Sequence, residues 1–173
     1  MPKLSVFLFF SLFIFSCSNE PSLKIIQGEI YGTTWQLKYS SDEDEVPIKA
    51  IVISELNRID KLFSHYKDDS LTSLINKNKI AYKDVAEEWK KLDKVGWDVH
   101  QQSNGYFNHK VSGDYDFNSF AKGYAVDKVS NILKANNINN FMVEIVGELR
   151  FEGLNNSKPW DFAIEDPCLA KLI

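Results

Sequence analysis

The stretch Asp116-Phe117-Asn118-Ser119-Phe120-Ala121-Lys122-Gly123-Tyr124-Ala125-Val126-Asp127 places a polar loop directly before the start of a helix. Gly123 lets a ligand or a second chain segment approach the backbone closely. The first N–H groups of a helix bind anions readily, and Lys122 adds a positive charge beside them. A ligand that carries phosphate would suit this arrangement. The alternative is a solvated lysine beside an ordinary helix cap, and spacing alone favours that alternative.

Apolar patterns on both sides of this stretch predict strands and helices in blocks. Alternating apolar and polar residues predict strands over 31–39, 141–146 and 149–152, with another strand starting at Trp160. Helical spacing predicts one helix through Val52–Phe63, one from Asp84 to about residue 103, one over 122–135, and a helical turn at 70–75. Blocks of strands and helices are typical of the α+β class.

The second of these helices is predicted to begin at Asp84. Asp84 and Glu87 have the spacing of a capping box, and Asn104-Gly105 is a good stop signal. The inward stripe of this helix is predicted to contain Val85, Trp89, Leu92 and Val99.

Composition and residue spacing argue against a nucleic-acid partner, a disulfide framework and a zinc site. The chain has 173 residues and a net charge of −4, without a basic run, so we expect no nucleic-acid partner. Its two cysteines are Cys17 and Cys168. Because Cys17 is expected to carry a lipid anchor, as described below, Cys168 has no partner for a disulfide framework. The three histidines lack the spacing of zinc ligands.

The N-terminus has the pattern of a bacterial lipoprotein signal. Lys3 precedes a short apolar run that ends before Ser16-Cys17. A membrane-spanning helix needs about 20 apolar residues, more than this run supplies; a buried core helix is the other alternative. We predict a signal peptide over 1–16, a lipidated Cys17 with a tether over 17–26, and one domain over 27–173. The protein is then expected in the cell envelope, anchored to a bacterial membrane by lipid and facing the periplasm or the outside.

The opening stretch resembles the Asp-Leu-Gly-x-x-Ala-Lys-Gly-Tyr-Ala-Val-Asp signature of the ApbE family of FAD:protein FMN transferases. Other stretches resemble segments of that family in the same order along the chain: Tyr31-Gly32-Thr33-Thr34-Trp35, Leu62-Phe63-Ser64-His65-Tyr66 with Asp69-Ser70 and Asn76, Ser103 to Asn108, and Val143 to Glu148 with Gly153 and Trp160. The resemblance implies an ApbE-like, T-fold-type domain of antiparallel strands packed with helices.

The resemblance also implies a reaction. Enzymes of this family use Mg²⁺ to split FAD, attach FMN through a phosphoester bond to a Thr of an exported acceptor protein, and release AMP. Residues that match the family's FAD-binding positions are Tyr31, Tyr66, Tyr106, Phe107, Asn108, Asp116 and Lys122. Ser119 matches a position that offers its backbone oxygen to the metal.

Several positions depart from the family pattern. Asn108 stands where the family has Asp, His109-Lys110 replaces Pro-Thr, and Val146 replaces the first glycine of a pair. Only a few residues connect Asn108 to Asp116, where the family carries tens more. The C-terminal part, which carries Asp and Thr side chains for the metal, is expected to be missing. The alternative is therefore a degenerate or truncated member that binds FAD or a partner without catalysis.

Overall fold

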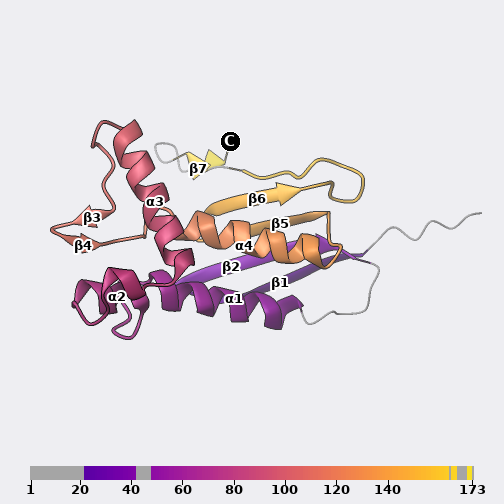
Figure 1. The fold of residues 1–173 in the computed structure, drawn as a ribbon. Helices are drawn as coiled ribbons and strands as arrows, with labels where there is room; N and C mark the ends of the chain where they lie inside the picture. The colour runs from indigo at the N-terminus through magenta and orange to yellow at the C-terminus, as the bar shows by residue number, and fades with distance from the viewer. Residues whose placement is uncertain (1–21, 42–47, 164, 167–170, 173) are drawn as a thin grey trace, which may run out of the picture.

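A four-stranded antiparallel sheet forms the centre of the protein (Figure 1). The computed structural model describes residues 22–41, 48–163, 165–166 and 171–172. The strands lie in the order β1-β2-β5-β6, and each neighbouring pair is antiparallel. Their bounds are Leu23–Ile30 for β1, Thr33–Ser40 for β2, Phe141–Ile145 for β5 and Glu148–Glu152 for β6.

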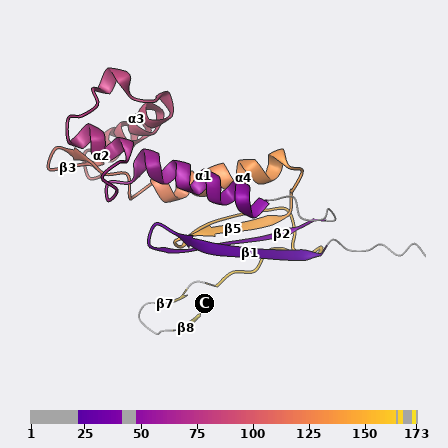
Figure 2. The same cartoon turned by 90° about the horizontal axis from the view of Figure 1, so that it is seen from below.

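Two long helices cover one face of this sheet. Figure 2 shows α1 (Ile48–Phe63) and α4 (Ala121–Ala135) on the same side of β1, β2 and β5. Alternate residues of β2 and β5 are buried in the core between the sheet and these helices: Trp35, Leu37, Tyr39, Phe141, Val143 and Ile145. Removing such apolar surface from water is the main term that stabilises the two layers. The arrangement confirms the predicted α+β class.

The elements between α1 and α4 in the chain form a lobe at one end of these layers (Figure 1). They are α2 (Leu71–Asn76), the 3-10 helix η1 (Tyr82–Asp84), α3 (Glu87–Gln102), β3 (Lys110–Val111) and β4 (Asp114–Tyr115). The interior of this aromatic lobe, residues 71–117, is built on ring contacts. Trp89 packs edge-on against Tyr115 and Phe117, with ring centroids 4.8 and 5.0 Å apart.

The predicted start of the second helix is wrong. Asp84 ends η1, and α3 begins at Glu87, whose N-cap residue Ala86 makes no side-chain capping bond. Trp89 and Leu92 are buried as predicted, but Val99 is 40% exposed. Gly96 lies on the buried face instead, because the imidazole of His109 fills the space beside it.

The strand predicted from Trp160 is also wrong. Residues 159–163 form no strand. Pro159 has no N–H to donate to a ladder, and the Trp160 indole N–H instead donates to the carbonyl of Glu152 at 3.1 Å. The strands that follow, β7 (Glu165–Asp166) and β8 (Lys171–Leu172), pair with each other.

The N-terminal boundary needs a correction. Strand β1 begins at Leu23, so residues 23–26 belong to the sheet and not to the tether predicted over 17–26. Cys17, Cys168 and the predicted signal peptide lie outside the described residues. No helix in the described part of the chain is long and apolar enough to span a bilayer.

Two tight hairpin turns lie at the same end of the sheet. Tyr31-Gly32 joins β1 to β2, and Val146-Gly147 joins β5 to β6. All four residues have positive φ, at 55° and 73° in the first turn and 55° and 83° in the second, which is the backbone of a type I′ turn. Valine is β-branched and costs free energy at positive φ. The sheet therefore holds a strained residue at this end.

Candidate functional site

A cavity of about 710 Å³, called the larger cavity below, lies beside the two hairpin turns. Four parts of the chain line it: the β1–β2 turn, the end of α1 with the loop after it, the start of α4 with Asn118, and Val146. Most of the lining is apolar, with a few polar groups among it, as is common for pockets that bind small molecules. Segments distant in sequence thus meet at one site.

Tyr31 is anchored in this cavity by its own hydroxyl. The O–H group donates a hydrogen bond to the carbonyl of Leu56 in α1 at 3.1 Å. Burial and the nearby carboxylates of Asp60 and Glu55 raise the pKa of Tyr31 well above its ordinary value. The phenol therefore stays protonated and keeps donating, which fixes its ring at the cavity wall.

Asp60 and Lys67 contribute an ion pair to the same wall. Asp60 is only 6% exposed, and its carboxylate pairs with the Lys67 ammonium. A carboxylate this buried is costly without such a partner. Sequence reasoning missed both residues. The available signal was a charged residue that lies one turn after Leu56 and next to Ile59 on the apolar face of α1.

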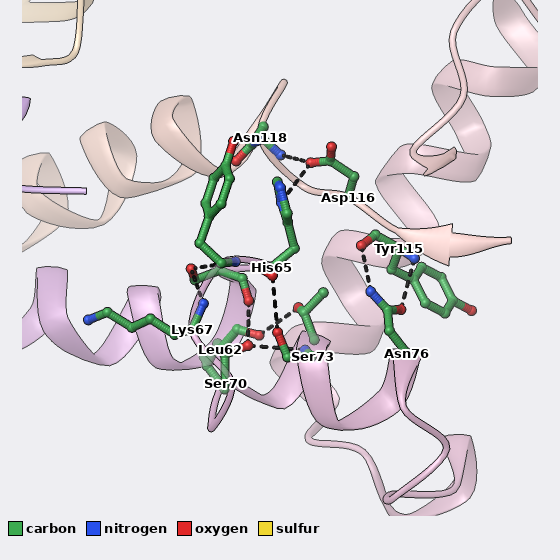
Figure 3. A network of polar contacts seen from close by, with 12 residues as sticks. Leu62, His65, Lys67, Ser70, Ser73, Asn76, Tyr115, Asp116 and Asn118 are labelled. Atoms are coloured by element: carbon green, nitrogen blue, oxygen red, sulfur yellow. Dashed lines mark hydrogen bonds and ion pairs between the residues drawn. The ribbon is translucent and has the colours of Figure 1, made fainter. Parts of the chain in front are cut away.

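Hydroxyl groups fix the loop that follows α1 (Figure 3). The Ser64 Oγ accepts hydrogen bonds from the N–H groups of Tyr66 and Lys67, both at 3.3 Å. The Ser70 hydroxyl donates to the Ser64 carbonyl and also accepts from the N–H of Ser73 as the N-cap of α2. These bonds satisfy groups that the end of a helix leaves unpaired, and they hold Tyr66 at the cavity.

A wall of four polar or aromatic side chains separates this cavity from a smaller one. The Asp116 Oδ1 lies 3.2 Å from the His65 Nδ1 and accepts the N–H of Asn118 at 2.9 Å (Figure 3). The Asn118 amide donates to the Tyr66 hydroxyl at 3.2 Å, and the His65 and Tyr66 rings are 3.9 Å apart. Asp116 and His65 face the smaller cavity, of about 300 Å³, whereas Tyr66 and Asn118 line the larger one.

The start of α4 presents unpaired donors beside the larger cavity. Its N-cap, Phe120, makes no side-chain capping bond. Within the described residues, the N–H groups of Lys122 and Gly123 have no acceptor and the Lys122 ammonium has no anionic partner. Lys122 lines the cavity. A helix start and a lysine together favour an anionic group such as phosphate.

A charged network fixes α4 to the other helices. Glu88 of α3 accepts both a bidentate pair from Arg58 of α1 and the hydroxyl proton of Tyr124 of α4. Lys128 adds a contact at 3.4 Å. The hydrogen bond from Arg58 is the largest of the effects that lower the pKa of Glu88 to about 2. The network ties the first turns of α4 to α1 and α3, which positions Lys122.

The predicted binding residues divide into three groups. Tyr31, Tyr66 and Lys122 meet at the larger cavity. Asp116 lines the smaller cavity, on the other side of the shared wall. Tyr106, Phe107 and Asn108 line neither. Tyr106 is 96% exposed, Phe107 packs on His109 and Phe120, and the Asn108 side chain accepts the N–H of Lys110 at 2.9 Å. The binding role of all seven residues stays a prediction.

Ser119, the predicted metal position, is exposed and lies one residue beyond cavity-lining Asn118. In the part of the chain that the structure describes, no group of three or more His, Cys, Asp or Glu side chains could hold a metal ion. Protein Mg²⁺ sites use one or two carboxylates together with substrate phosphates and water.

Comparison with known proteins gives one consistent family. The sequence model of the ApbE family matches residues 31–114 and 112–172. The FAD:protein FMN transferase of Haemophilus influenzae is 38% identical over 82 residues, which are 47% of this chain and 24% of that protein. The protein of the same name from Buchnera aphidicola is 25% identical over 215 aligned positions, which cover 93% of this chain and 63% of that protein.

Solved structures agree with the sequence matches. The flavin transferase ApbE from Vibrio cholerae superposes with a TM-score of 0.78 at 21% identity, over 88% of this chain and 67% of that one. The apo flavinyl transferase ApbE from Pseudomonas stutzeri gives 0.78 at 24% identity, over 89% and 66%. The chain thus spans about two thirds of the length of these structures. Its matches cover 24% and 63% of the two curated relatives. From the matched motifs, the fold and the sequence model, the chain belongs to the ApbE family.

Proposed function

We propose that this protein transfers FMN from FAD to a threonine of an exported acceptor protein. The observation that carries the proposal is the larger cavity, where two tyrosines and Lys122 meet at the unpaired N–H groups of α4. The relatives are named FAD:protein FMN transferase, and membership of the same family supports the same chemistry here.

The cavity matches the chemical parts of FAD. Flat apolar rings pack well on tyrosine faces, and Tyr31 and Tyr66 offer such faces at the cavity wall. A pyrophosphate suits the free donors of Lys122 and the helix start. The cavity volume of about 710 Å³ lies within the range of small-molecule sites.

In the proposed reaction the threonine Oγ attacks the phosphorus of the FMN half of FAD, and its hydroxyl proton is released to water. A phosphoester bond forms between that phosphorus and Oγ, the pyrophosphate bond to the other phosphorus breaks, and AMP leaves. The contribution of the chain is to hold the pyrophosphate and neutralise its charge as negative charge moves to the leaving AMP. Lys122 and the α4 N–H groups are the described residues suited to that role.

We also propose that the transfer depends on Mg²⁺. Mg²⁺ would neutralise phosphate charge when bound. Ser119 is the position of this chain that the family resemblance matches to the metal.

A second candidate is a family member that binds FAD without transfer. The observation that favours it is Val146, which holds a strained positive φ of 55° at the cavity where the family pattern has glycine. Its side chain occupies part of the space that a glycine would leave to a ligand.

We further propose that the protein works in the cell envelope, anchored by lipid on Cys17. The support is the sequence pattern of the first 17 residues. Replacing Cys17 with Ser and fractionating the cells tests the anchor. The variant should leave the membrane fraction, and unchanged membrane association would contradict lipidation of Cys17.

Incubation with FAD, Mg²⁺ and a threonine-containing acceptor domain tests the transfer. We expect covalent flavin fluorescence on the acceptor in a denaturing gel and stoichiometric AMP. An acceptor whose threonine is replaced by valine is the matched control. Saturable FAD binding without either product would favour the second candidate, and no binding at all would contradict both.

A further inference from the structure

We propose that Asp93 and His109 form a positioning pair that sets the path of residues 109–118 and thereby places Asp116 and Asn118 at the wall of the larger cavity. The inference rests on the proposed function only in that the ligand of this cavity is taken to be FAD. Neither residue lines the larger or the smaller cavity, so both act through the segment that follows His109.

The pair is completely enclosed. The His109 Nε2 lies 2.7 Å from the Asp93 Oδ1, and the two side chains are 0% and 4% exposed. The second oxygen of Asp93 accepts the hydroxyl proton of Tyr82 at 2.9 Å. Both carboxylate oxygens of Asp93 are thus paired, whereas the His109 Nδ1 has no partner. With no acceptor near Nδ1, the proton of a neutral imidazole belongs on Nε2, where it is donated to Asp93.

Packing leaves His109 a single orientation. Its ring centroid lies 5.1 Å from that of Trp97, 5.8 Å from Phe117 and 5.9 Å from Phe120. On the remaining side the ring contacts Gly96 of α3, where a Cβ would lie 2.6 Å from Nδ1. An imidazole held by rings, by a glycine and by a directional hydrogen bond fixes its own backbone as well.

That backbone leads directly to the cavity wall. The carbonyl of His109 accepts the N–H of Asp116 at 2.8 Å. Asp116 in turn accepts the N–H of Asn118, which lines the larger cavity. A second clamp lies beside this route, because the Asn76 side chain bonds both the N–H and the carbonyl of Tyr115. The displacement of His109 would therefore move Asp116 and Asn118.

This chain has a particular need for such a clamp. The two matched family segments meet at residues 112–114, in the hairpin of β3 and β4. The Buchnera alignment runs over 215 positions, more than the 173 residues of this chain, so that relative carries residues that this chain lacks. A short hairpin has few contacts of its own to set its register. The buried pair supplies a directional constraint at the point where the chain enters the hairpin.

A buried polar pair is weak support for stability but can specify one arrangement over others. This difference gives the test. We compare wild type with His109→Leu, which removes the donor, His109→Gln, which keeps an N–H donor near the Nε2 position, and Asp93→Leu/His109→Phe, which replaces both partners by apolar groups. Asp98→Asn is the matched control, because Asp98 is a partly exposed carboxylate on the same helix that pairs with Lys94.

Melting temperature and FAD affinity are measured on each variant. We expect His109→Leu to lower both and to weaken FAD binding about three- to thirtyfold. The apolar double variant should regain most of the melting temperature, since neither partner is left unpaired, while FAD binding stays weak. His109→Gln should keep FAD affinity closer to wild type than His109→Leu does, and Asp98→Asn should change neither quantity.

Two results would overturn the positioning role: an apolar double variant that binds FAD as tightly as wild type, or, if that variant does not fold, a His109→Gln variant that folds but binds FAD no better than His109→Leu. If wild type binds no FAD, the proposed function fails, but the amide NMR signals of Asp116 and Asn118 still test the pair. They should shift in His109→Gln and His109→Leu and stay in place in Asp98→Asn. Signals that stay in place in all three would contradict the inference.

Discussion

The two cavities share one wall but differ in what lines them. The larger cavity is mostly apolar and takes its residues from the sheet end and the two long helices. The smaller cavity is more polar and takes its residues from the aromatic lobe and from the loop before it, including Asp68, Lys77 and Asp116. The first offers ring faces, the Lys122 ammonium and free backbone N–H donors. The Lys77 ammonium of the second already pairs with Asp68 at 2.5 Å. Free donors, and not polarity as such, distinguish a ligand site.

Replacing Lys122 with Met should produce the largest change. A charged hydrogen bond to phosphate is worth about 1.5–3 kcal/mol, so FAD affinity should fall roughly ten- to a hundredfold. Lys77→Met, the matched control in the smaller cavity, should leave FAD affinity unchanged. Isothermal titration with FAD measures both variants. Equal losses in the two would erase the distinction between the cavities.

Gly96→Ala should destabilise the aromatic lobe. The added Cβ would lie 2.6 Å from the His109 ring, which Trp97 and Phe117 hold in place. Overpacking of this kind costs about 1–3 kcal/mol, and the better helix propensity of alanine offsets part of it. Urea unfolding measures the loss, with Val95→Ala on the exposed face of α3 as the control. A Gly96→Ala variant as stable as wild type would show that His109 moves freely.

Val146→Gly should raise stability by about 0.5–1 kcal/mol, because glycine adopts positive φ without the cost that a Cβ imposes. The same change enlarges the larger cavity, so FAD affinity should stay the same or rise. Thermal unfolding with and without FAD reports both effects. Gly147→Ala, at φ 83°, is the opposite control and should destabilise. Lower stability of the Val146→Gly variant would refute the strain assigned to this turn.

Acid should weaken the network that holds α4, and this loss of stability should be the smallest of the four effects. The pKa of Glu88 is lowered to about 2, chiefly by the hydrogen bond from Arg58, from an ordinary value near 4.5. The stabilisation is therefore complete above about pH 4.5 and is lost as the pH falls towards 2. Because Glu88 is partly exposed and screened by solvent, we expect less than about 1 kcal/mol. The free energy of unfolding, measured with urea at each pH, should change less with pH in Glu88→Gln than in wild type. An equal pH dependence in the two proteins would contradict the role of the network.

Local patterns predicted the layers well. Alternation over 31–39 and 141–146 predicted β2 and β5, and Trp35, Leu37 and Val143 on the apolar faces of these strands are buried. Helical spacing found α1 and α4. Such patterns work where one face of an element meets one core.

Polar contacts between residues distant in the sequence were not predicted. His109 looked like a simple departure from a motif, yet it is bonded to Asp93, 16 residues earlier. Asp60 lies at the larger cavity, where it pairs with Lys67 from the loop after α1. Tyr106 was selected by motif position and is almost fully exposed. Partners of this kind depend on how the loops close, which no local periodicity encodes.

Amide NMR of the protein during titration with FAD tests the central claim most directly, because it shows which of the two cavities the ligand enters. We predict saturable shifts at Gly32, Lys122 and Gly147, around the larger cavity, and none at Asp68 or Lys77. Shifts confined to the smaller cavity, or no saturable shifts at all, would contradict the assignment of FAD to the larger cavity.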